Sequence, residues 1–122
     1  MKKLLWFSRH KLTEAQYKDL QNIYQDDFIL RQVNITINSA KDILPDLEWC
    51  DIAAVVMPLH LQQEALEILK PWNKPMLVCS NHRVQKEDGS FHFLHAGWCE
   101  ITKIDIVKKT LSYFPQPEGS FR

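Results

Sequence analysis

The sequence predicts a three-layer α/β domain with a mainly parallel sheet and an antiparallel hairpin near its carboxyl-terminal end. Short continuous apolar runs, the pattern of strands covered on both faces, alternate with amphipathic stretches of helical spacing. An Asp-Gly dipeptide, the signal of a hairpin turn, follows the last such run. Helical crossovers join parallel strands, whereas a tight turn joins antiparallel ones. With 122 residues, we expect a single domain over residues 1–114 and a flexible tail over residues 115–122.

The first unit is a buried strand that leads into a capped helix. Leu4–Phe7 is a continuous apolar run. Thr13 and Gln16 have the spacing of a capping box, in which each residue satisfies a free backbone N–H group of the other. We therefore expect a helix from about Thr13 to Tyr24.

The next two strands differ in character. Phe28–Ile37 alternates apolar and polar residues, so we expect a strand near the sheet edge with one solvated face. Ser39 can cap a second helix, within which Pro45 must either kink the helix or begin a new turn. Ile52–Met57 is again continuously apolar and predicts a central strand.

The last part of the domain changes from parallel to antiparallel pairing. A helix over Leu59–Leu69 precedes a buried strand over Met76–Cys79. Beyond the hairpin turn, Phe91–Leu94 is expected to return as an antiparallel strand that ends at Ala96–Gly97. Trp98–Lys108 is consistent either with a further strand or with a strand followed by a helix.

The composition argues against several classes of partner. The 15 Lys and Arg residues balance the 15 Asp and Glu residues, so no overall field attracts long nucleic acid or an anionic membrane. No apolar run approaches the ~20 residues that span a bilayer. Met1–Trp6 resembles the start of a signal peptide, but Ser8–Lys11 ends the apolar stretch early, so we expect a cytoplasmic protein.

The chain has three cysteines, Cys50, Cys79 and Cys99, which is an odd number, and they lack CxxC spacing. We interpret them as reduced, mostly buried thiols.

Polar side chains follow three of the predicted buried strands. His10, His60 and His82 each come shortly after such a strand. Carboxyl ends of parallel strands lie at one edge of a sheet, where α/β domains bind ligands, so we expect these histidines to lie along that edge. The other residues that we place at this edge are Ser8, Arg9, Lys11, Thr13, Pro58, Ser80, Asn81 and Arg83. Trp98 could stack on a base or pack in the core, and the core is the favoured interpretation.

The sequence lacks the motifs of several common nucleotide-binding, metal and hydrolase sites. The 3 glycines form neither a dinucleotide fingerprint nor a P-loop, so side chains such as Arg9, Lys11 and Arg83 would have to bind any phosphate. The 5 histidines fit no common zinc spacing, and we expect neither a metal nor another cofactor. A Ser-His-Asp hydrolase is disfavoured because the chain lacks a GxSxG elbow.

Two blocks of the chain resemble a known family. Trp6–His10 with Leu12–Gln16 is similar to the opening of the small CRISPR-associated proteins of the Csx group, and Val55–Leu61 is similar to a second block of that group. Those proteins have a Rossmann-like fold related to the CARF domain. They bind cyclic oligoadenylate, the second messenger of type III CRISPR defence, usually as homodimers. Some cleave it without a metal as ring nucleases, and others only sequester it.

The resemblance implies a homodimer that binds a cyclic oligoadenylate, with cyclic tetra-adenylate the first choice, and cleaves it by in-line attack of a ribose 2′-OH. Catalytic roles would then belong to Ser8, Arg9 and His10. Ligand-binding roles would belong to Lys11, Thr13, Pro58, His60, Ser80, Asn81, His82, Arg83 and Trp98. Three alternatives stay open: a non-catalytic sensor or phage-encoded sponge, a small nucleotide or nucleoside transferase or hydrolase, and an interaction module without a ligand.

Overall fold

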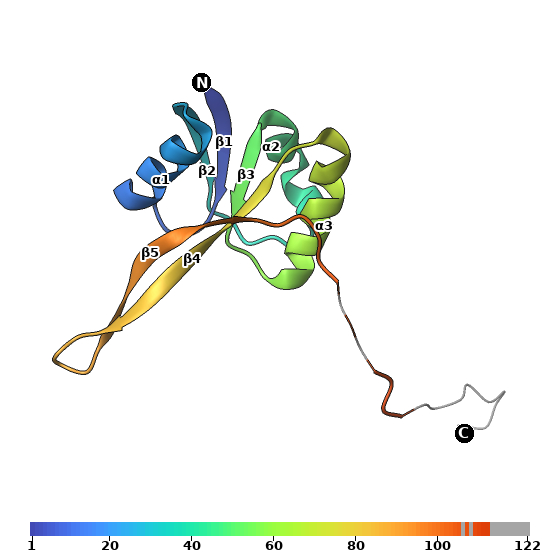
Figure 1. Ribbon diagram of the computed structural model, residues 1–122. Coiled ribbons are helices and arrows are strands. Elements are labelled where there is room, and N and C mark those ends of the chain that lie inside the picture. Colours follow the sequence, from blue (N-terminus) through green and yellow to red (C-terminus); the bar gives the residue numbers. More distant parts are fainter. Residues whose placement is uncertain (106, 108, 113–122) are drawn as a thin grey trace.

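Strand β1 (Lys2–Phe7) lies inside a five-stranded sheet of order β2-β1-β3-β4-β5 in the computed structural model, which describes residues 1–105, 107 and 109–112. Strands β1 to β4 are parallel and β5 is antiparallel to β4, which confirms the predicted α/β class with a hairpin at its end (Figure 1). The other elements are α1 (Glu14–Tyr24), β2 (Phe28–Val33), α2 (Leu44–Trp49), β3 (Ile52–Val55), α3 (Leu59–Leu69), β4 (Met76–Gln85) and β5 (Phe91–Glu100). The predicted tail over residues 115–122 lies outside the described residues.

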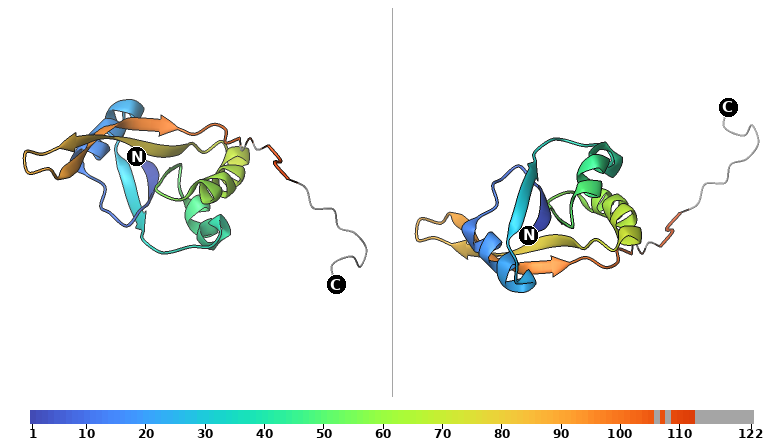
Figure 2. Two further views of the ribbon diagram at one scale, coloured as in Figure 1. Left: turned by 90° about the horizontal axis from the view of Figure 1, so that it is seen from below. Right: turned by 90° about the horizontal axis from the view of Figure 1, so that it is seen from above.

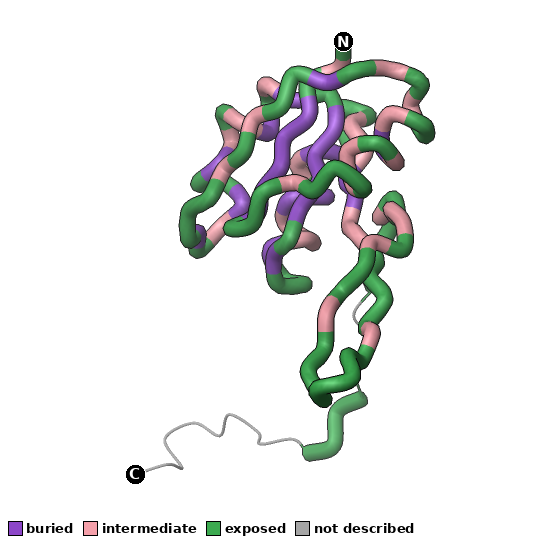
Figure 3. The backbone as a smooth tube through the Cα atoms, turned by 90° about the vertical axis from the view of Figure 1, so that its left-hand side faces the viewer, coloured by how far each residue is buried: buried purple, intermediate pink, exposed green. Residues whose placement is uncertain are grey.

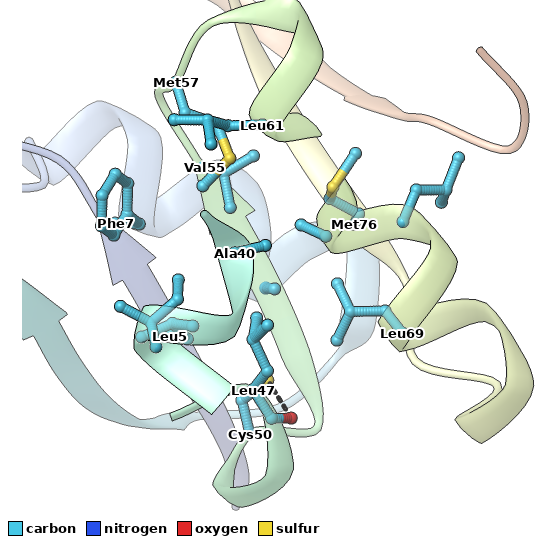
Figure 4. Close-up of a cluster of buried hydrophobic side chains, with 14 of the residues drawn as sticks. Leu5, Phe7, Ala40, Leu47, Cys50, Val55, Met57, Leu61, Leu69 and Met76 are labelled. Atoms are coloured by element: carbon cyan, nitrogen blue, oxygen red, sulfur yellow. Dashed lines mark hydrogen bonds between the residues drawn. The ribbon is translucent and has the colours of Figure 1, made fainter. Parts of the chain in front are cut away.

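Helices cover both faces of the sheet, which explains why the run Leu4–Phe7 of β1 is continuously apolar (Figure 2). Leu5 and Phe7 join the core beneath α2 and α3 (Figure 4), whereas Leu4 and Trp6 join the core beneath α1. Leu20 is the fully buried residue of α1. The alternation of side chains along one strand therefore ties two separate cores together.

The capping box at the start of α1 forms as predicted. The Gln16 backbone N–H donates to Thr13 Oγ1 over 3.1 Å, and the Thr13 N–H donates to Gln16 Oε1 over 2.8 Å. This reciprocal pair satisfies two helix-end donors. It also fixes the direction in which the amide of Gln16 points.

Pro45 begins a new helix rather than kinking one. Ser39 caps a 3-10 helix over Ala40–Ile43, and α2 starts directly after it with Pro45 in its first turn, where a missing N–H costs no hydrogen bond. Helix α3 has the predicted bounds. None of the described helices is both long and apolar enough to span a bilayer.

Two parallel strands end earlier than predicted. Strand β2 stops at Val33 rather than Ile37, and β3 stops at Val55 rather than Met57. The residues that follow leave the sheet and line pockets at its carboxyl edge. The apolar side chains among them, which indicated longer strands, form part of the pocket walls instead.

The fourth strand continues well beyond its predicted end. Ser80–Arg83 were expected in a loop, but β4 runs to Gln85 and pairs with β5 through this segment. Only Met76 and Leu77 pair with β3, so the hairpin projects past the carboxyl edge of the sheet (Figure 1). None of residues 78–100, all of which the structure describes, is buried (Figure 3). Polar residues that predicted a loop therefore belong to a strand that is solvated on both faces.

The fifth strand is also longer than predicted. The expected break at Ala96–Gly97 is a bulge within β5. The sequence was consistent with two structures for Trp98–Lys108. In the structure, the residues up to Glu100 complete β5, and residues 101–105 form neither helix nor strand.

The cysteines are all free, but their burial differs from the prediction. Cys50 is buried, Cys79 is partly exposed and Cys99 is exposed. Burial raises the pKa of Cys50 to about 11. Only Cys50 therefore fits the interpretation as an inert buried thiol.

Replacing Thr13 by Ala should lower the free energy of unfolding by about 1 kcal/mol, because Gln16 N–H loses its acceptor. Thr13→Ser retains the hydroxyl, and we expect its stability within about 0.5 kcal/mol of the unsubstituted protein. Urea denaturation followed by circular dichroism measures both. Equal losses in the two variants would show that the hydroxyl does not stabilise the helix.

Candidate functional site

The candidate site lies at the point where the chain leaves two neighbouring strands toward opposite faces of the sheet. The connection after β1 passes through α1, and the connection after β3 passes through α3 on the other face (Figure 2). The ends of these strands are adjacent, since the Val56 N–H donates to the Phe7 carbonyl over 2.8 Å. In open α/β sheets, such a switch point forms a crevice that binds ligands.

Two pockets adjoin at this point. The first, of ≈ 480 Å³, is lined by the ends of β1, β2 and β3 and by the start of α3. The second, of ≈ 350 Å³, is lined by the ends of β1 and β3, by the middle of β4 and by the start of α1. Their lining shares four residues: Ser8, His10, Val56 and Met57. The loop after β1 therefore forms a wall between the two pockets.

Hydrogen bonds fix the backbone of this loop. Ser8 is buried, its N–H donates to the Val33 carbonyl over 3.2 Å, and its Oγ accepts the His10 N–H over 3.1 Å. The His10 carbonyl accepts from Trp6 Nε1 over 2.7 Å and from Gln32 Nε2 over 3.0 Å. The loop is thus held by its main chain, while the side chain of His10 is exposed.

Basic side chains extend from the same loop into both pockets. Arg9 lines the first pocket, where its Nη2 donates to Thr36 Oγ1 over 3.3 Å. Lys11 and Thr13 line the second pocket. Pro58 lines the first pocket and Asn81 the second. The structure therefore gathers seven of the predicted site residues around the two pockets: Ser8, Arg9, His10, Lys11, Thr13, Pro58 and Asn81.

The other predicted residues lie elsewhere. His60 is exposed in the first turn of α3 and lines neither pocket. Ser80, His82 and Arg83 lie on the projecting part of β4, because that strand does not end where it was predicted to end. The Arg83 guanidinium lies 3.7 Å from the centre of the Phe91 ring. Of the three histidines, His10 lines both pockets, and neither His60 nor His82 lines either of them.

Trp98 belongs to the core, in line with the favoured interpretation. Its ring packs edge-on against Trp6 at 5.9 Å between centres, and its Nε1 donates to the Gln16 carbonyl over 3.1 Å. A partly buried indole with its N–H satisfied supports the hairpin and α1.

Sequence reasoning missed a second group of polar residues beside the second pocket. Cys79 Sγ lies 3.1 Å from His95 Nδ1, and His95 Nε2 lies 2.8 Å from Asp19 Oδ2. Asp19 comes from α1, Cys79 from β4 and His95 from β5. No local spacing in the sequence could have indicated a group assembled from three elements.

The chemistry of the edge suits a ligand with anionic and flat apolar parts. Arg9 and Lys11 supply cationic groups that can neutralise phosphate, His10 adds an imidazole, and the walls between them are largely apolar. Among the described residues, no group of three or more His, Cys, Asp or Glu side chains is placed to hold a metal ion. No protein-family model matches the chain, and neither a curated protein nor a solved structure matches it.

Proposed function

We propose that this protein binds a cyclic oligoadenylate at the carboxyl edge of its sheet, with cyclic tetra-adenylate as the first ligand to test. One observation carries the proposal: the loop Ser8–Lys11 presents an imidazole and two cationic side chains to adjoining pockets at the switch point. The resemblance to the Csx-group proteins falls on this same loop and on the segment after β3 that faces it.

The two kinds of surface at the edge match the two parts of a nucleotide. Phosphate groups would lie against Arg9 and Lys11, which can form charge-assisted hydrogen bonds with them. Adenine rings would enter the pockets, whose walls include Phe7, Ile35 and Met57. Specificity for adenine would then come from polar side chains of the lining such as Thr36 and Asn81.

The size of the ligand favours a dimer. Pockets of ≈ 480 Å³ and ≈ 350 Å³ are in the range that holds a drug-sized molecule, and a ring of several nucleotides is larger. A cyclic oligoadenylate with an even number of units has a twofold axis. A homodimer with the same axis would place two copies of this edge around one ring.

Cleavage would use the ring's own ribose hydroxyl. The 2′-oxygen attacks the adjacent phosphorus, the bond from phosphorus to the 5′-oxygen breaks, and a 2′,3′-cyclic phosphate forms. The proton of the 2′-OH is accepted by a base, and the 5′-oxygen takes a proton from an acid. His10 can serve in either step because an imidazole can both accept and donate a proton, and Arg9 can stabilise the charge that develops on phosphate. The Ser8 hydroxyl, which already accepts the His10 N–H, can still donate its proton to the ligand.

Replacing Arg9 by Gln should weaken binding of cyclic tetra-adenylate about 10- to 100-fold, because a hydrogen bond to a charged group is lost. Isothermal titration calorimetry measures the affinity. Arg83→Gln is the matched control: it removes the same charge from the hairpin, outside both pockets, and should leave the affinity unchanged. Absence of binding to the unsubstituted protein, or equal losses in both variants, would refute the proposed site.

Replacing His10 by Asn should slow ring opening about 10²- to 10⁴-fold, the usual contribution of a general acid or base, and should leave binding largely intact. Chromatography of linear products under multiple-turnover conditions measures this. His60→Asn removes an exposed imidazole outside the pockets and should turn over normally. If the unsubstituted protein binds tightly but releases no linear product, the protein sequesters its ligand and the catalytic part of the proposal is wrong.

A further inference from the structure

Three side chains beside the second pocket form a continuous line of polar contacts. His95 Nδ1 is the nearest acceptor to Cys79 Sγ, at 3.1 Å, and Asn81 Oδ1 lies farther away at 3.6 Å. The other ring nitrogen of His95 lies 2.8 Å from Asp19 Oδ2. A thiol, an imidazole and a carboxylate in this order have the geometry of a nucleophile, its base and the group that orients the base.

A bulge in β5 gives His95 this position. Ser80 pairs with Gly97 and Asn81 pairs with His95, so Ala96 has no partner on β4. Without the bulge, residues three apart such as His95 and Trp98 would face opposite sides of the sheet. With it, both contact α1: His95 bonds to Asp19 and Trp98 bonds to the Gln16 carbonyl. Bulges commonly redirect a side chain next to an active site.

The surroundings hold the imidazole in one orientation. Only 10% of the His95 side chain is exposed, and its ring packs against Trp98 at 5.7 Å between centres. Ionised carboxylate accepts hydrogen bonds only, so Asp19 selects the tautomer with the proton on Nε2. The lone pair of Nδ1 is then directed toward the thiol of Cys79.

Gln16 supplies a donor next to the sulfur. Its Nε2 lies 3.4 Å from Cys79 Sγ, while its Oε1 accepts the Thr13 N–H within the capping box. The capping box therefore holds the Gln16 amide nitrogen beside Cys79 Sγ, from where its N–H groups could reach an oxygen on a carbon bound to that sulfur. A donor at such a position stabilises the negative charge of a tetrahedral intermediate.

The thiol needs a base at neutral pH. Burial raises the pKa of Cys79 above its ordinary value, against a smaller opposing effect of the Gln16 hydrogen bond. The resting thiol is therefore protonated, and attack requires transfer of its proton to a neighbour. Cys99 provides a contrast, because it pairs with Val78 on the opposite face of the hairpin and its Sγ lies 3.6 Å from Ser80 Oγ.

We propose that Cys79 is the nucleophile of a second activity, the hydrolysis of small esters or thioesters through an S-acyl intermediate, with His95 as the base and Asp19 as a positioning residue. Sγ attacks the acyl carbon while its proton moves to His95 Nδ1. The bond to the leaving oxygen or sulfur then breaks, and the leaving group takes that proton. Water, deprotonated by His95, attacks the thioester, which releases the acid and restores the thiol.

The second pocket indicates the substrate class. The lining of the pocket that includes Cys79 also includes Val55, Met57 and Val78, whose apolar side chains suit a short apolar acyl group. Lys11 and His10 lie on the part of this pocket formed by the loop after β1, where a leaving group with negative charge would be stabilised. The activity shares this pocket with the proposed nucleotide site but requires no cyclic nucleotide.

Incubation of the full-length protein with p-nitrophenyl acetate tests the proposal. We expect release of p-nitrophenolate and acetylation of Cys79, located by peptide mass spectrometry, at a rate about 10²-fold above that of Cys99 in the same molecule. Cys79→Ser should abolish rapid release, and Cys99→Ser should leave it unchanged. Equal acetylation of Cys79 and Cys99 would overturn the proposal. Because no cyclic nucleotide is present, failure of this test is distinct from failure of the proposed function.

Substitutions at the base and at its partner separate chemistry from structure. His95→Asn and Asp19→Asn should slow acetylation of Cys79 and leave that of Cys99 unchanged, with circular dichroism confirming that each variant is folded. The ¹⁵N chemical shifts of His95 should show the Nε2-protonated tautomer. In Asp19→Asn, they should show a mixture of the two tautomers. If His95→Asn does not fold, the rate of Cys79 acetylation in Asp19→Asn tests the assignment. An unchanged rate at Cys79 in a folded variant would contradict the assignment.

Discussion

The hydrogen bond from Trp6 Nε1 to the His10 carbonyl, 2.7 Å long, connects the core of this protein to its candidate site. Trp6 is buried in the core beneath α1, and its ring packs edge-on against Trp98 of the hairpin. Trp98 in turn contacts His95 and donates to the Gln16 carbonyl. One indole at the end of β1 thus holds the loop after that strand, the start of α1 and the base of the hairpin in a fixed relation. Both proposed activities depend on this arrangement.

Local signals predicted the part of the fold that local interactions form. The capping box of Thr13 and Gln16 is read directly from two side chains three residues apart, and α3 has the bounds that its helical spacing indicated. The loop Ser8–Lys11 could likewise be assigned to the site, because its strand is buried on both faces and must end at the carboxyl edge. In the capping box and in α3, residues close in sequence are also the structural partners.

The hairpin could not be predicted in the same way. Ser80–Arg83 have the composition of a loop, and only pairing with β5, a non-local partner, makes them a strand. The bulge at Ala96 depends on the register of that pairing, and His95 meets Asp19 across 76 positions of sequence. The contacts of Cys79 therefore could be identified only from the three-dimensional structure. The same extension of β4 places His82 and Arg83 outside both pockets. Their sequence position, directly after a predicted buried strand, had indicated that they belong to the site.

The central claim is that a ligand binds at the loop that Trp6 anchors, and the indole N–H signals of the 4 tryptophans test it most directly. In a ¹H–¹⁵N spectrum, addition of cyclic tetra-adenylate should shift the Trp6 signal, because its N–H bonds to the His10 carbonyl. Trp72, which is 42% exposed and lies in the 3-10 helix Lys70–Trp72 before β4, should not respond. A shift at Trp72 with an unchanged Trp6 signal, or no shift at saturating ligand, would contradict the account.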